Sequence, residues 1–295
     1  AVAASGEEAA AHLVRAAHLR VERLANVDGA IADLEKALEL HPGSRDAAHD
    51  LSALLRRRSN FTRLKSTLSA AAAKADAERS AELWLECAGL LSDDMDDRHG
   101  AISVLDRLLR TMPNHVPTLQ RQAGYFHDEE QYSEAIALYG RIVRLAPDSR
   151  TLRNTHLELA RLWDDKLGDS QRSLVSLQAV LSIDPTNLRG LTRLADIHER
   201  EGRAVDATEA AKRLLLACPS ADRERAAALI RLARLQREQG LDAAASEALR
   251  EAVAIEGPGS ESALECKALT KSTAAWSQYY DALEQHLGQL PEDAV

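Results

Sequence analysis

The sequence is poor in the residues that mark turn-rich, aromatic-rich or membrane-spanning proteins. Its 295 residues include 14 glycines, 8 prolines and only 3% aromatic residues. Glycines and prolines are too few for an all-β protein of this length, whose many turns need them. No stretch of about 18 apolar residues occurs, so no segment is expected to cross a membrane. Helix is the expected secondary structure.

Cysteines are also few. Cys87, Cys218 and Cys266 are far apart and show no CxxC spacing, so we expect apolar core residues in a reducing compartment, which favours the cytoplasm. The chain begins Ala-Val-Ala, without an initiator methionine or a hydrophobic signal core. We therefore expect a fragment or a processed chain, and a periplasmic location stays open if a signal peptide was removed.

An excess of positive charge is absent as well. The chain has 46 acidic and 37 basic residues, which gives a net charge of −9. This balance argues against a protein that binds duplex DNA or anionic membranes through its overall charge. Disorder is excluded by the 45% of hydrophobic residues, which suffice for a core. The length fits either two globular domains or one repetitive array.

What the sequence does contain is a repeat. Residues that stop a helix recur at nearly constant intervals, at Pro42, Asp76, Pro113, Pro147, Pro185, Pro219, Gly257 and Pro291. Their residue numbers differ successively by 34, 37, 34, 38, 34, 38 and 34. Proline cannot continue a helix and disfavours the helical conformation in the residue before it. Each interval therefore predicts two helices of about four turns, joined by short turns.

Each interval also carries small and large apolar residues at helical spacing. Ahead of Pro42 these are Ala30, Leu34 and Ala37. Residues three or four apart share one face of a helix. We expect the small residues to let paired helices approach closely, giving helical hairpins that bury their apolar faces by stacking on their neighbours.

This pattern resembles the tetratricopeptide repeat family, whose 34-residue helix-turn-helix motif has fixed aromatic, small and proline positions. Trp84 stands in the family's Trp slot, and Trp163 and Phe126 stand in its Tyr slot. The first Ala slot is filled by Ala30, Ala101, Ala135, Ala207 and Ala245. The best match is the segment 132–139, with the sequence YSEAIALY.

The resemblance covers residues 11–291, between a lead-in of residues 1–10 and a tail of residues 292–295. It implies an all-α fold, a right-handed α-α superhelix (solenoid) of about eight hairpins that end near the eight helix stops. The Leu-Gly pair of the family is mostly replaced by Leu-Ala, so period and phase together carry the resemblance.

The alternation of long and short intervals adds a second period. The long intervals carry most of their extra residues before the first helix, in segments 77–82, 150–155 and 221–226. Three or four added residues make one helical turn, which lengthens a helix without moving its apolar face. Segments 90–95 and 162–167 also align, and their residue numbers differ by 72. The sequence therefore predicts a repeating pair of hairpins, as in large bacterial tetratricopeptide proteins.

No residue set for catalysis is found. The sequence lacks GxxxxGK, GxGxxG, HExxH and GxSxG, so we expect neither an enzyme nor a cofactor. The acidic run 93–99 has carboxylates at alternate positions, as calcium sites do, but no glutamate closes an EF-hand loop. We expect a solvated, helix-capping turn there and no metal site. No two histidines have the i,i+4 spacing of zinc ligands.

The resemblance implies that the first helix of each hairpin lines a concave groove that binds a peptide or a partner helix. The third and fifth hairpins contribute acidic residues to these helices, and the sixth and seventh contribute arginines. The candidate partner-binding residues are Arg189, Arg193, Arg231, Arg234, Arg237, Glu158 and Asp164. Arginine forks suit the carboxylates of an acidic segment in a protein or peptide partner. The alternative is a solvated face whose arginines are balanced by Glu199, Glu201 and Glu238.

Nucleic-acid binding is the rival use of these arginines. Single strands need aromatic platforms between positive charges, and most aromatics here stand in packing slots or near the C-terminus, so this use is disfavoured. Trp276, Tyr279 and Tyr280 form the densest aromatic cluster. They are expected to form the core of the last hairpin, or else an exposed end where the array continues or associates with another copy.

The sequence thus predicts a non-enzymatic protein-interaction scaffold or adaptor with a partner-binding groove. The alternative is that the chain is an arm of a larger enzyme, regulator or envelope assembly machine. The bias toward arginine and alanine is typical of a GC-rich bacterial genome.

Overall fold

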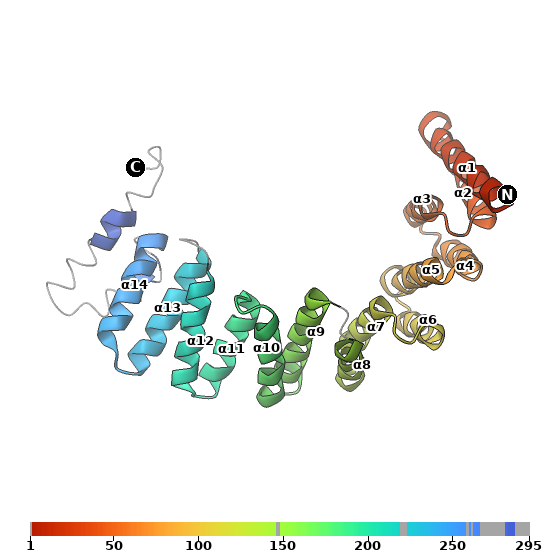
Figure 1. Cartoon of the computed structure of the whole chain (residues 1–295). Coiled ribbons are helices and arrows are strands. Elements are labelled where there is room, and N and C mark those ends of the chain that lie inside the picture. The colour runs from red at the N-terminus through yellow and green to blue at the C-terminus, as the bar shows by residue number, and fades with distance from the viewer. Residues whose placement is uncertain are drawn as a thin grey trace. The chain divides into compact units, whose positions relative to one another are not determined.

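The structure is a computed structural model that describes residues 2–145, 148–218, 223–257, 260, 262–265 and 281–286. The described residues form helices and turns and no strand (Figure 1). The chain divides by its contacts into two compact units, residues 1–145 (unit 1) and residues 146–295 (unit 2). The prediction of an all-α fold is confirmed.

Unit 1 consists of four consecutive helical hairpins. Its helices are α1 (Val2–Leu24), α2 (Val27–Leu40), α3 (Arg45–Arg57), α4 (Phe61–Ala72), α5 (Ala77–Gly89), η1 (Leu90–Asp94), α6 (Arg98–Thr111), α7 (Val116–Asp128) and α8 (Tyr132–Leu145). Helix α1 runs without a break across residues 10 and 11, so no break marks the expected start of the array.

Unit 2 continues with three described hairpins. Its helices are α9 (Ser149–Arg161), η2 (Leu162–Lys166), α10 (Ser170–Ile183), α11 (Leu188–Arg200), α12 (Ala204–Ala217), α13 (Arg223–Glu238) and α14 (Asp242–Glu256). Residues 262–265 and 281–286 are also helical, and Ala263 and Ala282 pack against the core of α13 and α14. The aromatic cluster Trp276, Tyr279 and Tyr280, and the helix stops Pro147, Pro219 and Pro291, lie outside the described residues.

Each odd-numbered helix, here called a first helix, packs against the even-numbered second helix that follows it, and each second helix packs against the next first helix inside its unit. The small residues of the repeat lie between them. Ala30, Ala101, Ala135, Ala207 and Ala245 are all fully buried. A buried methyl group in these slots brings the two helix backbones close together, as the sequence pattern predicts.

The turn inside each hairpin has one residue in the left-handed conformation. These residues are Ala25, Ser59, Asp96, Glu130, Gly168, Gly202 and Gly240, with φ between 50° and 75°. Their residue numbers differ successively by 34, 37, 34, 38, 34 and 38, which is the alternation found for the helix stops. The next residue closes the turn: the amide of Asn60, for example, donates to the carbonyl of Leu55 at 2.9 Å. Such closure satisfies carbonyls at the helix end.

Two of the three long intervals differ from the short ones at the end of the first helix. Helices α5 and α9 start directly after the capping residues Asp76 and Asp148 and continue into the π-helical turns η1 and η2. At the end of η1 the amide of Met95 donates to the carbonyl of Leu90, five residues back. The predicted lengthening of these helices is confirmed, whereas the widened last turn was not predicted.

The longer period, of two hairpins, also holds along the chain. Five consecutive elements correspond to the next five in order: α5, η1, α6, α7 and α8 to α9, η2, α10, α11 and α12. In each corresponding pair the residue numbers of the first residues differ by 72. The acidic run 93–99 spans the end of η1, the turn after it and the start of α6, and in that turn the Asp97 carboxylate accepts from the amide of Gly100 at 2.8 Å. Its predicted role as a helix-capping turn is confirmed.

Candidate functional site: a groove along the first helices of unit 2

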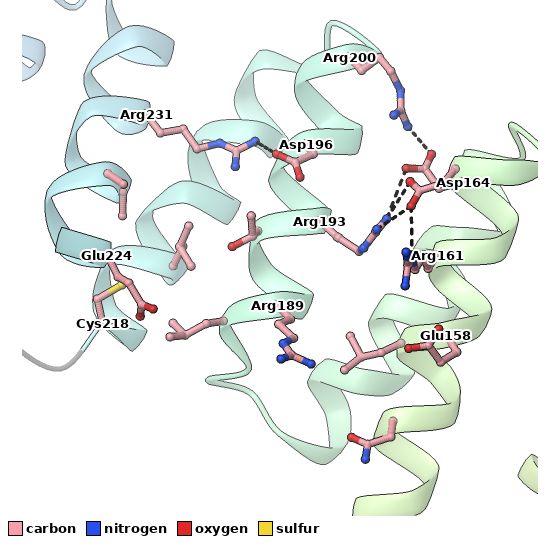
Figure 2. A pocket seen from close by; sticks show the side chains of 18 residues that line it. Glu158, Arg161, Asp164, Arg189, Arg193, Asp196, Arg200, Cys218, Glu224 and Arg231 are labelled. Atoms are coloured by element: carbon pink, nitrogen blue, oxygen red, sulfur yellow. Dashed lines mark hydrogen bonds and ion pairs between the residues drawn. The ribbon is translucent and has the colours of Figure 1, made fainter. Parts of the chain in front are cut away.

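A groove of about 970 Å³ lies along the first helices α9, α11 and α13 of unit 2. Figure 2 shows charged side chains projecting into it from these three helices. Five of the seven candidate residues named from the sequence line this groove, namely Glu158, Asp164, Arg189, Arg193 and Arg231.

The other two candidates do not line the groove. Arg234 forms an ion pair with Glu265, with Nε at 2.8 Å from the carboxylate. Arg237 is exposed on the same helix, α13. A step of three residues turns an α-helix by about −60°, so two steps carry Arg237 about 120° from Arg231. This rotation separates Arg237 from Arg231, and of the three arginines only Arg231 lines the groove.

The groove carries equal numbers of charges of each sign. Its basic residues are Arg161, Arg189, Arg193, Arg200 and Arg231, and its acidic residues are Glu158, Asp164, Asp165, Asp196 and Glu224. The arginine-rich surface read from the sequence is thus electrically balanced, because acidic residues of the neighbouring first helices face the arginines.

Most of these charges are paired between consecutive first helices. Arg193 of α11 donates to both carboxylate oxygens of Asp165 in η2, at 3.0 and 2.7 Å. Arg231 of α13 donates to Asp196 and Glu199 of α11, each at 2.5 Å. For Arg193 and Arg231 these contacts favour the alternative in which acidic residues balance the charge of the arginines. The same contacts connect α9–η2 to α11, and α11 to α13.

Asp164 is the most buried charge of the groove. Its side chain is 4% exposed and accepts hydrogen bonds from Arg200 and from the Ser170 hydroxyl, the latter at 3.4 Å. The π-helical turn η2 places Asp164 inward and Asp165 beside Arg193. A buried carboxylate of this kind is tolerated because its partners replace the lost water.

The pKa of Asp165 is held below its ordinary value, chiefly by the hydrogen bonds from Arg193 and, in smaller part, by the positive charges of Arg193, Arg161 and Arg200. The same hydrogen bonds raise the pKa of Arg193. Both residues therefore stay ionised at neutral pH.

The floor of the groove is apolar. Leu214, Cys218 and Ala228 are buried there, and Leu157 and Leu188 are half-buried beside them. Burial of an apolar side chain against such a floor is favourable by about 25 cal/mol per Å². The groove can thus hold an apolar side chain below and polar groups above.

Sequence reasoning missed several lining residues, above all Arg161, Arg200, Asp196 and Glu224. A usable signal was present, because paired charges of opposite sign recur about one repeat apart in the sequence. Arg45 pairs in this way with Glu82, and Asp196 with Arg231. Such a separation joins equivalent helices of neighbouring hairpins.

The predicted acidic residues of the third hairpin, Glu82 and Glu86, belong to unit 1 and do not line this groove. Glu82 accepts from Arg45 of α3 at 2.6 Å, and Glu86 accepts from Ser52 at 2.5 Å. A smaller cavity of about 470 Å³ lies farther along unit 1, between Leu85 of α5 and one face of α7.

The described residues were also compared with the requirements of a metal site and of a membrane-spanning helix. No three His, Cys, Asp or Glu side chains among them are grouped to hold a metal ion. Each helix in this part of the chain is too short or too polar to span a lipid bilayer.

Comparison with known proteins shows similarity of structure rather than of sequence. No family model matches the chain, and no curated protein matches it. The C-terminal part of a TPR repeat-containing protein from Cytophaga hutchinsonii aligns with a TM-score of 0.61, at 13% identity, over 88% of this chain and 100% of its own. A tetratricopeptide repeat protein from Parabacteroides merdae aligns with a TM-score of 0.45, at 13% identity, over 95% of this chain and 99% of its own.

Proposed function

The chain has the fold of tetratricopeptide repeat proteins, and we propose on this basis that it is a non-enzymatic scaffold or adaptor that binds a segment of a partner protein. The proposed binding site is the groove along α9, α11 and α13, which we call the unit 2 groove. Its lining carries the proposal, because an apolar floor lies beneath fixed charged groups.

The composition of the groove suits a peptide. Binding sites combine a concave, largely apolar surface with a few polar groups that set orientation. Here Leu157, Leu188 and Leu214 supply the apolar surface, and the ion pairs of Arg193 and Arg231 hold the walls at fixed positions. A preorganised surface binds with a smaller loss of conformational entropy than a mobile one.

A blocked groove tests this proposal. Ala227 is exposed and lines the groove, so Ala227→Trp fills the groove without disturbing the core. Peptides selected from a random display library on the native chain should bind the Ala227→Trp variant at least about tenfold more weakly, a loss of about 1.4 kcal/mol. Fluorescence anisotropy measures the dissociation constants.

Ala243→Trp is the matched control, because Ala243 is exposed on α14 and outside the groove. It should leave the affinities unchanged. Selected peptides that bind both tryptophan variants equally, or a selection that yields no binding peptide, would overturn the proposal.

A further inference from the structure

Internal ion pairs neutralise most of the charged side chains in the unit 2 groove. Arg161, Arg193, Arg200 and Arg231 each lie within 4.0 Å of a carboxylate, and these contacts also occupy Asp164, Asp165 and Asp196. The side chains of three charged groove residues form no ion pair or hydrogen bond among the described residues: Glu158, Arg189 and Glu224. These three are available to a ligand.

The three available charges come from three consecutive first helices. Glu158 lies on α9, Arg189 on α11 and Glu224 on α13. Figure 2 shows Arg189 between Glu158 and Glu224, in the part of the groove away from Asp164 and its arginine partners. Across the groove the order of charge is therefore negative, positive, negative.

The position of Arg189 is unfavourable for the helix that carries it. Arg189 lies in the first turn of α11, which has no acidic residue there. The N-terminal end of a helix carries a partial positive charge and disfavours a cation. Since Arg189 is also exposed, the stability of the fold does not account for a cation at this place.

We propose that the unit 2 groove recognises a peptide segment in the polyproline II conformation that carries a basic, an acidic and a basic residue in that order, at every third position. The acidic residue would pair with Arg189, and the two basic residues with Glu158 and Glu224. This inference rests on the proposed function, and it names the class of segment that the groove selects.

The spacing follows from the geometry of the first helices and of a polyproline II chain. Consecutive first helices pack on the second helix between them and are bridged by arginine–carboxylate ion pairs, so their axes lie roughly 10 Å apart. A polyproline II chain has three residues per turn and advances about 3.1 Å per residue, so every third side chain points the same way about 9.3 Å farther along. A segment in this conformation that crosses α9, α11 and α13 therefore presents a side chain to a new helix at every third residue. The side chains between the charged positions point to other sides of the chain, and apolar ones can be covered by Leu157, Leu188 and Leu214.

A designed peptide tests the proposal directly. The probe has lysine at its first and seventh positions, glutamate at its fourth, and leucine or alanine between them, with both termini blocked to remove their charges. Its charge-inverted counterpart has the same composition of apolar residues. We expect the probe to bind at least about tenfold more tightly than the inverted peptide; equal affinities would overturn the proposal.

Charge reversal of the protein provides the second arm. Arg189→Glu should weaken binding of the probe by about tenfold, and the triple variant Glu158→Lys, Arg189→Glu, Glu224→Lys should prefer the inverted peptide. Arg237→Glu is the matched control, because Arg237 is exposed on α13 outside the groove. A triple variant that keeps the original preference would contradict the assignment of these residues.

The two proposals fail in different ways. If library peptides lose affinity with Ala227→Trp but the designed probe and its inverted form bind equally, the groove binds peptides and the charge order is wrong. Circular dichroism establishes that each variant is folded, which is expected because the side chains of Glu158, Arg189 and Glu224 form no hydrogen bond or ion pair among the described residues that the substitutions would break.

Discussion

The buried carboxylate of Asp164 stabilises unit 2 through its partners Arg200, Arg193 and Ser170. Asp164→Ala leaves the side chain of Arg200 without its partner at the edge of the groove. Removing one member of a buried pair costs about 3–5 kcal/mol; because the Arg200 side chain is 55% exposed, we expect a loss of about 2 kcal/mol. Urea denaturation measures it.

The neighbouring Asp165 provides the comparison for this prediction. Its side chain is 37% exposed, so Asp165→Ala should cost at most about 1 kcal/mol, as measured for exposed ion pairs. Equal losses for the two variants would show that burial of Asp164 does not set its contribution to stability.

Two histidines of unit 2 make stability depend on pH. Burial lowers the pKa of His156 on α9 and of His198 on α11 below the ordinary value of 6.5, and the Nδ1 atom of each is buried without a hydrogen-bond partner. The folded protein therefore holds these protons less tightly than the unfolded chain. Stability is complete above about pH 6.5 and falls as the pH decreases below it.

Thermal denaturation between pH 7.5 and pH 5 measures this effect. The double variant His156→Leu, His198→Leu should lose stability less steeply over this range than the native chain. A native stability that stays constant down to pH 5 would contradict the prediction.

The lowered pKa of Asp165 acts at lower pH, where its stabilisation is lost as the carboxylate gains a proton.

At the scale of the element, the hairpin turns differ between the two units. All three described turns of unit 2 have glycine at the left-handed position, whereas unit 1 has Ala25, Ser59, Asp96 and Glu130 there. A side chain in this conformation costs about 1–2 kcal/mol, which glycine avoids, although glycine also gains entropy in the unfolded chain.

Glu130→Gly should therefore stabilise unit 1 by about 0.5–1 kcal/mol, and Gly202→Ala should destabilise unit 2 by a similar amount. Chemical denaturation of each variant measures the change. Gln131→Gly is the control, because Gln131 follows the turn and its φ is not positive; it should not stabilise. A loss of stability in Glu130→Gly would refute this account of the turn.

The ends of helices could be predicted from the sequence where a helix-stopping residue recurs at the repeat interval. The helix stops at Pro42, Pro113 and Pro185 mark the ends of α2, α6 and α10 within two residues. This holds because the proline ring prevents the helix from continuing at that residue, whatever the neighbouring repeats are. The π-helical turns were not predictable, because an added helical turn can be absorbed in several ways and tertiary packing decides among them.

For the whole molecule, the period predicted the fold, but the sequence of one hairpin could not predict the pairing of its charges. The sequence left open whether Arg193 and Arg231 are binding groups or are balanced by acidic residues, and the structure places acids of the preceding first helices beside them. Arg189 looked no different from them in sequence. Which arginine stays available is decided by contacts between repeats, since side-chain reach and helix rotation determine each pairing.

The charge balance of the unit 2 groove has a consequence for kinetics. Five arginines face five carboxylates, so the groove has little net field to draw a charged ligand from a distance. Electrostatic steering raises association rates well above about 10⁵–10⁶ M⁻¹s⁻¹ only when such a field exists. A partner would therefore meet the groove by unassisted diffusion, and its selection would show in how long it stays rather than in how fast it arrives.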